Sequence, residues 1–370
     1  MALLGALRKA FDDRVDVFSV APLLDFPHSR ILVAPNAKWK IDHSINATMA
    51  SFINLPGIKH ITRFIATFVF VTLWSHKNRK KERVIILHGL QSCKIWGVLV
   101  GQIFAPSLII PFLTDDIGIP TKWEKPLLKK FRIIDIYLMK LGIKRVSGVI
   151  AMTSNLSHKL APGHQHLIIP AIMNTESITI NSKSRNDNYF NIVYAGGLFQ
   201  NYGLTLLINA FNLANRDNWR LIIAGKGDME RKIFEFVRQN KNINYMGFLN
   251  TEEICNLYEK ADVFVNPRLL FENISEFSFP SKIVEYLSTG KPVISTNLPV
   301  FDDGFRDHLI ISKSDSPREL IQCLEEVSSW DDHQRELWRK KSLEFVNTNL
   351  SPVTQGLQIR NFVNVLQNSR

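Results

Sequence analysis

The chain has 370 residues, of which 45% are hydrophobic and 21% charged, so its composition excludes a disordered protein and leaves room for two domains of ordinary size. Lysine and arginine (45) exceed aspartate and glutamate (34) by 11, which favours an anionic partner: nucleic acid, an anionic membrane surface or a phosphate-bearing substrate. The three cysteines, Cys93, Cys255 and Cys323, lie far apart without the spacing of a metal site, so we expect free thiols in a reducing compartment.

The first half of the chain alternates strand-like apolar runs with helix-like segments, which predicts an α/β domain with a parallel sheet. It begins on a helical pattern, ALLGALRKAF, without the charged start of a signal peptide. A domain of this class usually opens on a strand, so the first strand is apparently missing. The expected strands are 15–22, 30–35, 83–89, 108–115, 148–154 and 166–174. The expected helices are 46–54, 58–77, 92–104 and 125–142.

The longest apolar run of this half is FIATFVFVTLW, at 64–74. It is shorter than the roughly 20 residues that a helix needs to cross a bilayer. We interpret the run as a buried helix, and the alternative is a monotopic contact with a membrane surface. We expect a cytoplasmic protein.

The second half repeats the alternation after a polar stretch at 175–188, which is rich in serine and asparagine and is the predicted linker. The expected strands are 190–197, 219–228, 243–249, 261–267 and 291–297. The expected helices are 203–215, 229–239, 251–259, 281–288, 316–328, 332–346 and 351–367. The pattern predicts two Rossmann-like, doubly wound domains that face a central cleft. The N-terminal domain is expected at 1–174 and the C-terminal domain at 189–347. A terminal helix at 348–370 follows and could cross back to the N-terminal domain.

The segment FSFPSKIVEYLSTGKPVI, at 277–294, places three polar groups on one short helix that begins after a proline. The hydroxyl of Ser281, the ammonium of Lys282 and free amides at the helix start would suit a phosphate. Glu285, one turn deeper, suits a vicinal diol such as a ribose, because a carboxylate accepts two hydrogen bonds. The alternative is an amphipathic helix with a Lys282–Glu285 surface pair.

Three strands of this half end in groups that are compatible with phosphate. The turn AGGLFQNYG contains Gly196 and Gly197, and the turn AGKGD contains Lys226 and Gly227. Glycine lets backbone amides approach a ligand. The side chain of Lys226 could face either a bound nucleotide, which combines a phosphate with a ribose diol, or solvent. The strand ADVFVNPR ends at Arg268, whose guanidinium could bind phosphate with two hydrogen bonds.

The order of these motifs resembles the nucleotide-sugar domain of retaining glycosyltransferases of family 4, which have the GT-B fold. The resemblance covers about residues 190–300, and the segments at 109–120 and 148–160 resemble bacterial surface-polysaccharide transferases more loosely. It implies transfer of a hexose-type sugar, with retained configuration, from a UDP- or GDP-linked donor to a lipid-linked (polyprenyl-diphosphate) or saccharide acceptor. It implies no cofactor and no obligatory metal.

The resemblance also assigns roles to single residues. Glu285 matches the second glutamate of the family's Glu-x7-Glu motif, and the position of the first falls on Phe277, next to Glu276, which could substitute. The family's arginine and lysine after the first strand fall on Gly197 and Tyr202, both uncharged. The diphosphate, and the charge that grows on it during transfer, is then left to Ser281, Lys282, Arg268 and backbone amides.

On the acceptor side, the family's catalytic histidine falls near Asp115, which is our candidate for that role, with Asp116 beside it. His88 ends another strand and is either a site residue or a packed one. His164 and His166 have no carboxylate or cysteine partner nearby, so we expect a solvated loop and no metal site.

The basic segments 77–83, 122–132 and 143–146 are either solvated surfaces or a docking site for anionic lipid, the latter at the inner face of the cell membrane. Two other functions remain open. One is a degenerate GT-B subunit that binds a nucleotide sugar or a partner without turnover, because the family's charged positions are missing. The other is nucleic-acid binding, which only the net charge favours, and no recognised module accompanies it.

Overall fold

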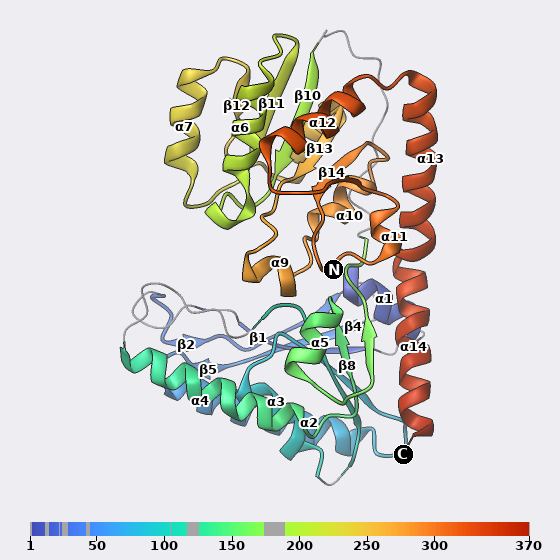
Figure 1. Cartoon of the computed structure of the whole chain (residues 1–370). Helices are drawn as coiled ribbons and strands as arrows, with labels where there is room; N and C mark the ends of the chain where they lie inside the picture. Colours follow the sequence, from blue (N-terminus) through green and yellow to red (C-terminus); the bar gives the residue numbers. More distant parts are fainter. Residues whose placement is uncertain are drawn as a thin grey trace. The chain divides into compact units, whose positions relative to one another are not determined.

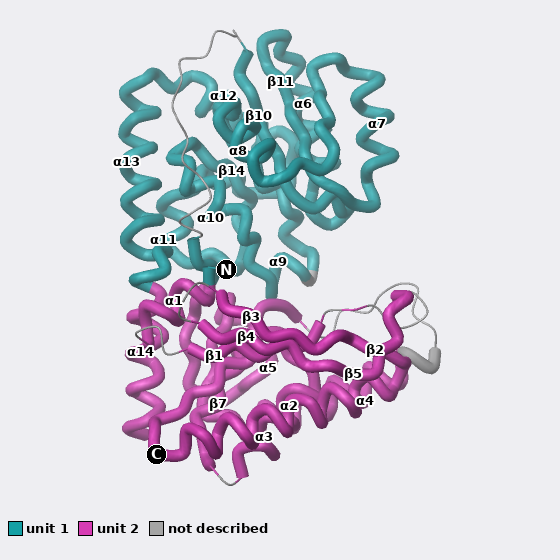
Figure 2. Tube along the Cα trace, turned by 180° about the vertical axis from the view of Figure 1, so that it is seen from behind, with its two compact units in different colours: residues 1–2, 170–354 teal, residues 3–169, 355–370 magenta. Residues whose placement is uncertain are grey.

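The computed structural model describes residues 2–11, 15–21, 23, 29–41, 45–103, 105–116, 126–173 and 189–369. The predicted linker at 175–188 lies outside the described residues. The chain forms two compact units (Figure 2). Unit 1 contains Met1–Ala2 and Pro170–Thr354, and unit 2 contains Leu3–Ile169 and Gln355–Arg370.

Unit 1 contains a parallel sheet with the strand order β12-β11-β10-β13-β14-β15 (Figure 1). Counted along the chain, this is the order 3-2-1-4-5-6 of a Rossmann sheet, whose strand order reverses between β10 and β13. The strands are β10 (Phe190–Ala195), β11 (Trp219–Ala224), β12 (Ile243–Tyr245), β13 (Val263–Asn266), β14 (Val293–Thr296) and β15 (Ile310–Ser312). Five of them confirm predicted strands, and β15 was not predicted because its three residues form too short a run.

Helices cover both faces of this sheet. They are α6 (Leu204–Ala214), α7 (Glu230–Gln239), α8 (Thr251–Lys260), α9 (Asn273–Phe277), α10 (Lys282–Leu287), α11 (Asp303–Arg306), α12 (Pro317–Ser328) and α13 (Asp332–Asn349), with a 3-10 turn, η1, at Gln200–Tyr202. Alternate residues of β13 separate the two layers: Val263 and Val265 belong to the core under α6 and α12, whereas the ring of Phe264 stacks on Tyr286 of α10 at 4.3 Å.

Unit 2 contains a second parallel sheet, ordered β6-β7-β8-β9, with a mixed sheet β1-β4-β3 and an antiparallel pair β2-β5. The strands are β1 (Asp16–Val20), β2 (Val33–Ala34), β3 (Ala37–Ile41), β4 (Ile45–Ala50), β5 (Phe52–Ile53), β6 (Val84–His88), β7 (Leu108–Leu113), β8 (Val149–Ala151) and β9 (His166–Ile168). The helices are α1 (Ala2–Ala10), α2 (Ile58–Lys77), α3 (Ser92–Gly101), α4 (Pro126–Ile143), α5 (Ser154–Leu160) and α14 (Pro352–Asn368). The α/β class is therefore confirmed.

Two predictions for the first half were wrong. The segment 46–54 is not a helix but forms β4 and β5, because Ile45 and Ala47 are buried and Asn46 between them is exposed, which is the period of a strand. The run 64–74 is helical but not wholly buried, because Ile65 and Leu73 are exposed.

Glycine at position 203 joins the end of the first loop of unit 1 to α6 in a left-handed conformation, with φ +76°. A Cβ there would overlap the carbonyl oxygen of Pro267, so this loop and the one after β13 can touch only because residue 203 is glycine. Gly247 has a similar φ, +69°, but a Cβ there would meet no atom within 4 Å.

A comparison of Gly203 with Gly247 separates the effect of backbone strain on stability from the effect of close packing. We expect Gly247→Ala to destabilise unit 1 by about 1 kcal/mol, which is the typical strain of a non-glycine residue at positive φ. Gly203→Ala carries the same strain and the overlap as well, so it should lower the thermal unfolding midpoint clearly further. Equal midpoints for the two variants in calorimetry would contradict the packing that we describe.

Candidate functional site

The candidate site lies at the carboxyl ends of β10 and β13, where the strand order of a Rossmann sheet reverses and ligands bind. The start of α10 lies there, and two of its amides do not await a ligand as predicted: Ile283 N–H donates to the carbonyl of Pro280 at 2.9 Å and Val284 N–H to that of Ser281 at 3.1 Å. Ser281 is exposed, and its hydroxyl does not cap the helix. Binding of an anion here would therefore rely on side chains as well as on the helix end.

Lys282 carries the strongest candidate group. Its Nζ atom is buried and has no hydrogen-bond acceptor in the described part of the chain. It lies 3.9 Å from the ring centroid of Tyr194. Burial, and then the charge of Arg268, lower the pKa of Lys282 well below its usual value, and Glu285 acts in the opposite direction. A buried ammonium that has no hydrogen-bond acceptor among the described residues is suited to an anionic ligand.

Gly196 leaves space beside this ammonium. A Cβ at Gly196 would lie 3.6 Å from Cδ and 3.9 Å from Nζ of Lys282, and the residue has φ +147°, a conformation that favours glycine. The backbone after β10 therefore passes directly over the lysine side chain. A ligand at this strand end would meet both.

Arg268 supplies a second cation from the loop after β13. The residue is buried, and its Nη1 atom donates to the carbonyl of Ser278 at 2.7 Å. The ring of Tyr202 lies 4.9 Å from the guanidinium and 6.0 Å from the Lys282 ammonium. Tyr202 thus replaces a charged residue of the family pattern but places an electron-rich ring near both cations.

Glu285 is held by an aromatic residue that the sequence did not single out. Its Oε2 atom accepts a hydrogen bond from the Tyr258 hydroxyl at 3.1 Å. Desolvation raises the pKa of Glu285, and both this bond and the charge of Lys282 oppose the rise. Among the described residues no ion pair joins Lys282 to Glu285, so the two are not a surface pair. Glu276 is exposed on α9.

The glycines of the two turns mostly serve internal packing, contrary to the prediction that their amides await a ligand. Gly196 N–H donates to the carbonyl of Ala224 at 3.0 Å, and Gly227 N–H donates to the Glu230 carboxylate at 3.1 Å. A Cβ at Gly227 would overlap the carbonyl oxygen of Leu198. The two turns therefore lock together through these positions.

The remaining donor-side candidates lie near aromatic rings. A Cβ at Gly197 would lie 2.9 Å from the ring of Phe199 and 3.1 Å from that of Tyr202. Lys226 is exposed, and its Nζ atom lies 4.9 Å from the ring centroid of Phe248. These contacts do not indicate a role in ligand binding for Gly197 or Lys226.

In unit 2, the acceptor-side candidates gather at the carboxyl ends of β6 and β7. Burial, and then the charge of Lys94, lower the pKa of His88, whereas Asp115 raises it, so the three groups share one electrostatic environment. The His88 ring also stacks on Phe112 at 5.8 Å. Asp115 is exposed. The structure thus brings His88 and Asp115 together, as neighbouring parallel strands should.

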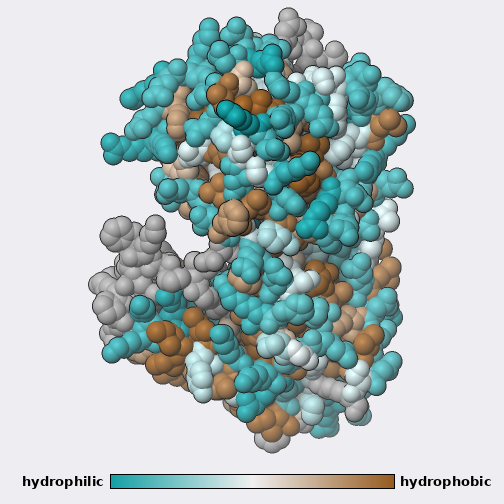
Figure 3. All heavy atoms as spheres, viewed as in Figure 1, coloured by the Kyte–Doolittle hydropathy of each residue, from teal (hydrophilic) through white to brown (hydrophobic). Residues whose placement is uncertain are grey.

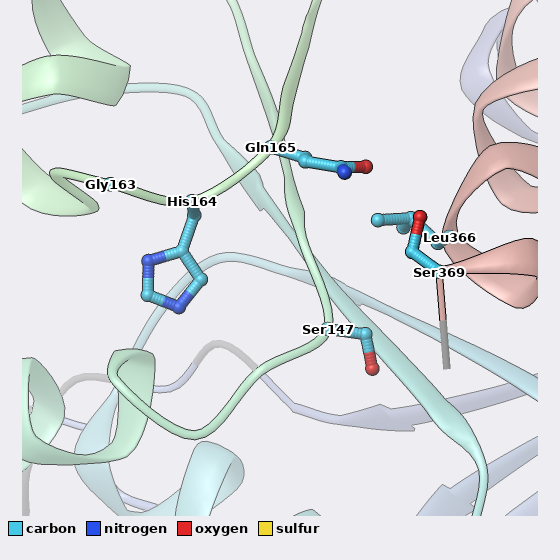
Figure 4. Close-up of a pocket in the computed structure, with 6 residues that line it drawn as sticks. All are labelled: Ser147, Gly163, His164, Gln165, Leu366 and Ser369. Carbon is cyan, nitrogen blue, oxygen red and sulfur yellow. The ribbon is translucent and has the colours of Figure 1, made fainter.

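Asp116 is engaged elsewhere, in an ion pair of 2.8 Å with Lys159 of α5. His164 was predicted to lie on a solvated loop, but it is half-buried and lines a cavity of about 260 Å³ with Ser147, Gln165 and residues of α14 (Figure 4). Among the described residues no cluster of three histidine, cysteine or acidic side chains could hold a metal ion.

Comparison with known proteins supports a glycosyltransferase. Residues 189–329 match the family described as "Glycosyl transferases group 1". The chitobiosyldiphosphodolichol β-mannosyltransferase of Candida albicans is 29% identical over 136 residues, which cover 35% of this chain and 29% of that protein. The matched segment therefore spans less than a third of this relative's length.

Two solved structures resemble nearly the whole chain. Sucrose-phosphate synthase from Thermosynechococcus elongatus has a TM-score of 0.68 at 15% identity, covering 98% of this chain and 92% of that one. HepE from Anabaena, in complex with UDP, has a TM-score of 0.63 at 17% identity, covering 98% and 95%. These likenesses establish the GT-B fold, and the family match at residues 189–329 lies within its second domain.

The lowered pKa of Lys282 predicts how stability depends on pH. Between that pKa and 10.5 the unfolded chain holds the proton and the folded chain does not, so the wild-type protein gains stability as pH rises. Lys282→Met removes the buried charge, so it should raise the thermal midpoint most at low pH, and this advantage should shrink toward pH 10. The exposed Lys313→Met is the control. A difference between Lys282→Met and wild type that stays constant from pH 6 to 10 would refute the assignment.

Proposed function

We propose that this protein is a retaining glycosyltransferase that moves a hexose-type sugar from a UDP- or GDP-linked donor to a lipid-linked or saccharide acceptor. The observation that carries the proposal is the buried Lys282 Nζ, which has no acceptor among the described residues and lies at the strand-order reversal of the segment that matches the glycosyl transferases group 1 family. A diphosphate at this point would supply the missing hydrogen-bond acceptor.

The donor would bind through three kinds of group. Lys282 and Arg268 would neutralise the diphosphate, and the Ser281 hydroxyl would add a donor at the exposed side. Glu285 holds one carboxylate oxygen on Tyr258 and would offer the other to the ribose hydroxyls. The UDP bound to HepE supports a nucleoside diphosphate as the ligand class for this fold.

In the proposed reaction, the bond from sugar C1 to the diphosphate oxygen breaks while C1 bonds to the acceptor hydroxyl oxygen on the same face. The hydroxyl proton passes to the leaving phosphate oxygen. The breaking C1–oxygen bond leaves its electron pair on the β-phosphate until the proton arrives, so negative charge grows where Lys282 and Arg268 are already fixed by packing and need little reorganisation. The proposal assigns no step to a metal or a cofactor.

Unit 2 would bind the acceptor. His88 and Asp115 would orient the attacking hydroxyl, and the Asp116–Lys159 ion pair would fix the loop that carries Asp115. The Candida relative is named for a lipid-diphosphate-linked sugar, which supports a lipid-linked acceptor as the class. We place the reaction in the assembly of bacterial surface polysaccharide, at the cytoplasmic face of the cell membrane.

A second candidate is a degenerate subunit that binds a nucleotide sugar without turnover. Two observations favour it: the family's charged loop positions are Gly197 and Tyr202, and the amides of Gly196 and Gly227 are occupied within the protein. Sugar transfer or hydrolysis of the donor by the purified protein would exclude this candidate.

The donor site is tested by titration calorimetry with UDP and GDP and their sugars. Lys282→Met and Glu285→Gln should each weaken binding of the preferred nucleotide by about tenfold or more, which corresponds to about 1.4 kcal/mol for one charge-assisted interaction. The exposed pair Lys313→Met and Glu344→Gln should bind as the wild type does. Unchanged affinity in both site variants would end this assignment.

The acceptor site is tested by separating transfer from donor binding. His88→Ala and Asp115→Asn should lower the rate of transfer by about 10²-fold, which is typical for loss of a positioned acid–base group. They should leave nucleotide affinity unchanged, because both residues belong to unit 2. His333→Ala, an exposed histidine of unit 1, is the control. A proportional loss of donor binding would show that these residues do not act on the acceptor.

A further inference from the structure

Helix α2 has its polar face inside unit 2 and its apolar face outside. Its buried residues recur every four positions and are mostly polar: Lys59, Arg63, Thr67, Val71 and Ser75. Its exposed apolar residues are Ile58, Ile61, Ile65, Val69 and Leu73, and Ile61 and Leu73 are 61% and 67% exposed. Each exposed residue from Ile61 on lies two positions from a buried one, about 200° around a helix, so the two sets face opposite directions.

Specific contacts explain why the polar face is buried. Lys59 Nζ donates to the carbonyl of Leu23 at 2.5 Å, and Arg63 Nη2 donates to that of Ala21 at 2.7 Å. The Arg63 guanidinium also lies 4.3 Å from the ring centroid of Phe52. Turning the apolar face inward would break these bonds and leave charges unsatisfied, so the orientation of α2 is fixed.

The neighbouring helix reinforces this orientation. A Cβ at Gly97 of α3 would lie 2.8 Å from Cβ of Thr67, and one at Gly101 would lie 3.0 Å from Cβ of Val71. The backbones of α2 and α3 therefore approach closely along the buried face. The apolar face of α2 is directed away from this contact.

The strand pair β2-β5 extends the apolar face. Val33 and Ile53 are directly paired and both exposed, and Ile53 N–H donates to the hydroxyl of Thr62 on α2 at 3.2 Å. We call the combined set the α2 apolar surface; it comprises Val33, Ile53, Ile58, Ile61, Ile65, Val69 and Leu73. An exposed apolar set of this extent marks an interaction surface.

The basic charge near α2 indicates which partner covers the α2 apolar surface. The segment 58–77 contains no acidic residue, and the exposed residues Lys77, Arg79, Lys80 and Lys81 follow at its end. No described helix is long and apolar enough to cross a bilayer. A second copy of this chain would carry the same net charge of +11, whereas anionic lipid carries the opposite charge. On the face drawn in Figure 3, apolar side chains also gather over α4, whose Phe131, Ile134 and Tyr137 are exposed.

We propose that the α2 apolar surface docks this protein on a membrane that contains anionic lipid, with α2 lying in the plane of the interface. The apolar residues enter the boundary between headgroups and acyl chains, and the cluster Lys77–Lys81 binds the headgroups. The docking does not depend on any sugar transfer, so it stands or falls independently of the proposed reaction.

The test is co-sedimentation of the full chain with vesicles of phosphatidylcholine, with and without about 30% phosphatidylglycerol, a composition of the kind that anionic-lipid docking requires. Wild-type protein should bind the anionic vesicles. Ile61→Ser/Leu73→Ser should lower the partition coefficient by about tenfold. The matched control is Leu213→Ser/Leu337→Ser, which changes leucines of unit 1 that are 60% and 55% exposed and should bind as the wild type does.

A second pair of variants tests the charge. Lys80→Ala/Lys81→Ala should lower binding to anionic vesicles about 30-fold, since each basic residue near the surface contributes about 1 kcal/mol, and Lys232→Ala/Lys241→Ala should not. Absence of vesicle binding, or equal losses in test and control pairs, would overturn the proposal. So would a wild-type dimer that Ile61→Ser/Leu73→Ser converts to a monomer in light scattering, because the surface would then cover a second copy.

Discussion

The geometry of the proposed donor site depends on one hydroxyl group. The Tyr286 hydroxyl donates to the carbonyl of Ala195 at 2.8 Å and accepts from its amide at 2.9 Å, so it joins α10 to the last residue of β10. Tyr286 is fully buried, and its ring stacks on Phe264 of β13. One side chain thus connects the two strands that flank the strand-order reversal to the helix that carries Lys282. The bonds fix where the ammonium lies relative to the turn at Gly196.

This arrangement makes the site selective for charge. Lys282 and Arg268 repel each other, and burial disfavours both cations, so an anion beside them would be stabilised by both charges. The rings of Tyr194 and Tyr202 lower the free energy of the cations without removing their capacity to bind an anion, because a π face is a weaker partner than a carboxylate. Glu285 lies on the same helix but is held by Tyr258, so it does not neutralise the lysine.

The sequence predicted the sheet of unit 1 and the helix of the donor site well, because the strands are continuous apolar runs and Pro280 and Gly290 bracket a short amphipathic segment. It did not reveal Tyr258 or Tyr286, because an aromatic residue on an apolar face has the same pattern whether its hydroxyl packs or positions a site. It also missed that the amides of Gly196 and Gly227 are used internally, since a glycine can serve either a ligand or a neighbouring loop. These distinctions depend on contacts between residues far apart in the chain.

The same limit explains the misinterpretation of the run 64–74. Hydropathy along a helix gives the direction of its apolar face but not which neighbours the helix has, and the usual assumption is that the apolar face packs inward. In α2 the polar face packs inward instead. The carbonyl groups of Ala21 and Leu23 accept hydrogen bonds from Arg63 and Lys59, and these bonds offset the cost of burying the two cations. With Lys59 and Arg63 hydrogen-bonded inside unit 2, the apolar face of α2 is directed outward. A helix that contradicts the inward rule, and whose buried cations Lys59 and Arg63 donate to backbone carbonyls inside the unit, therefore points to a partner outside the protein.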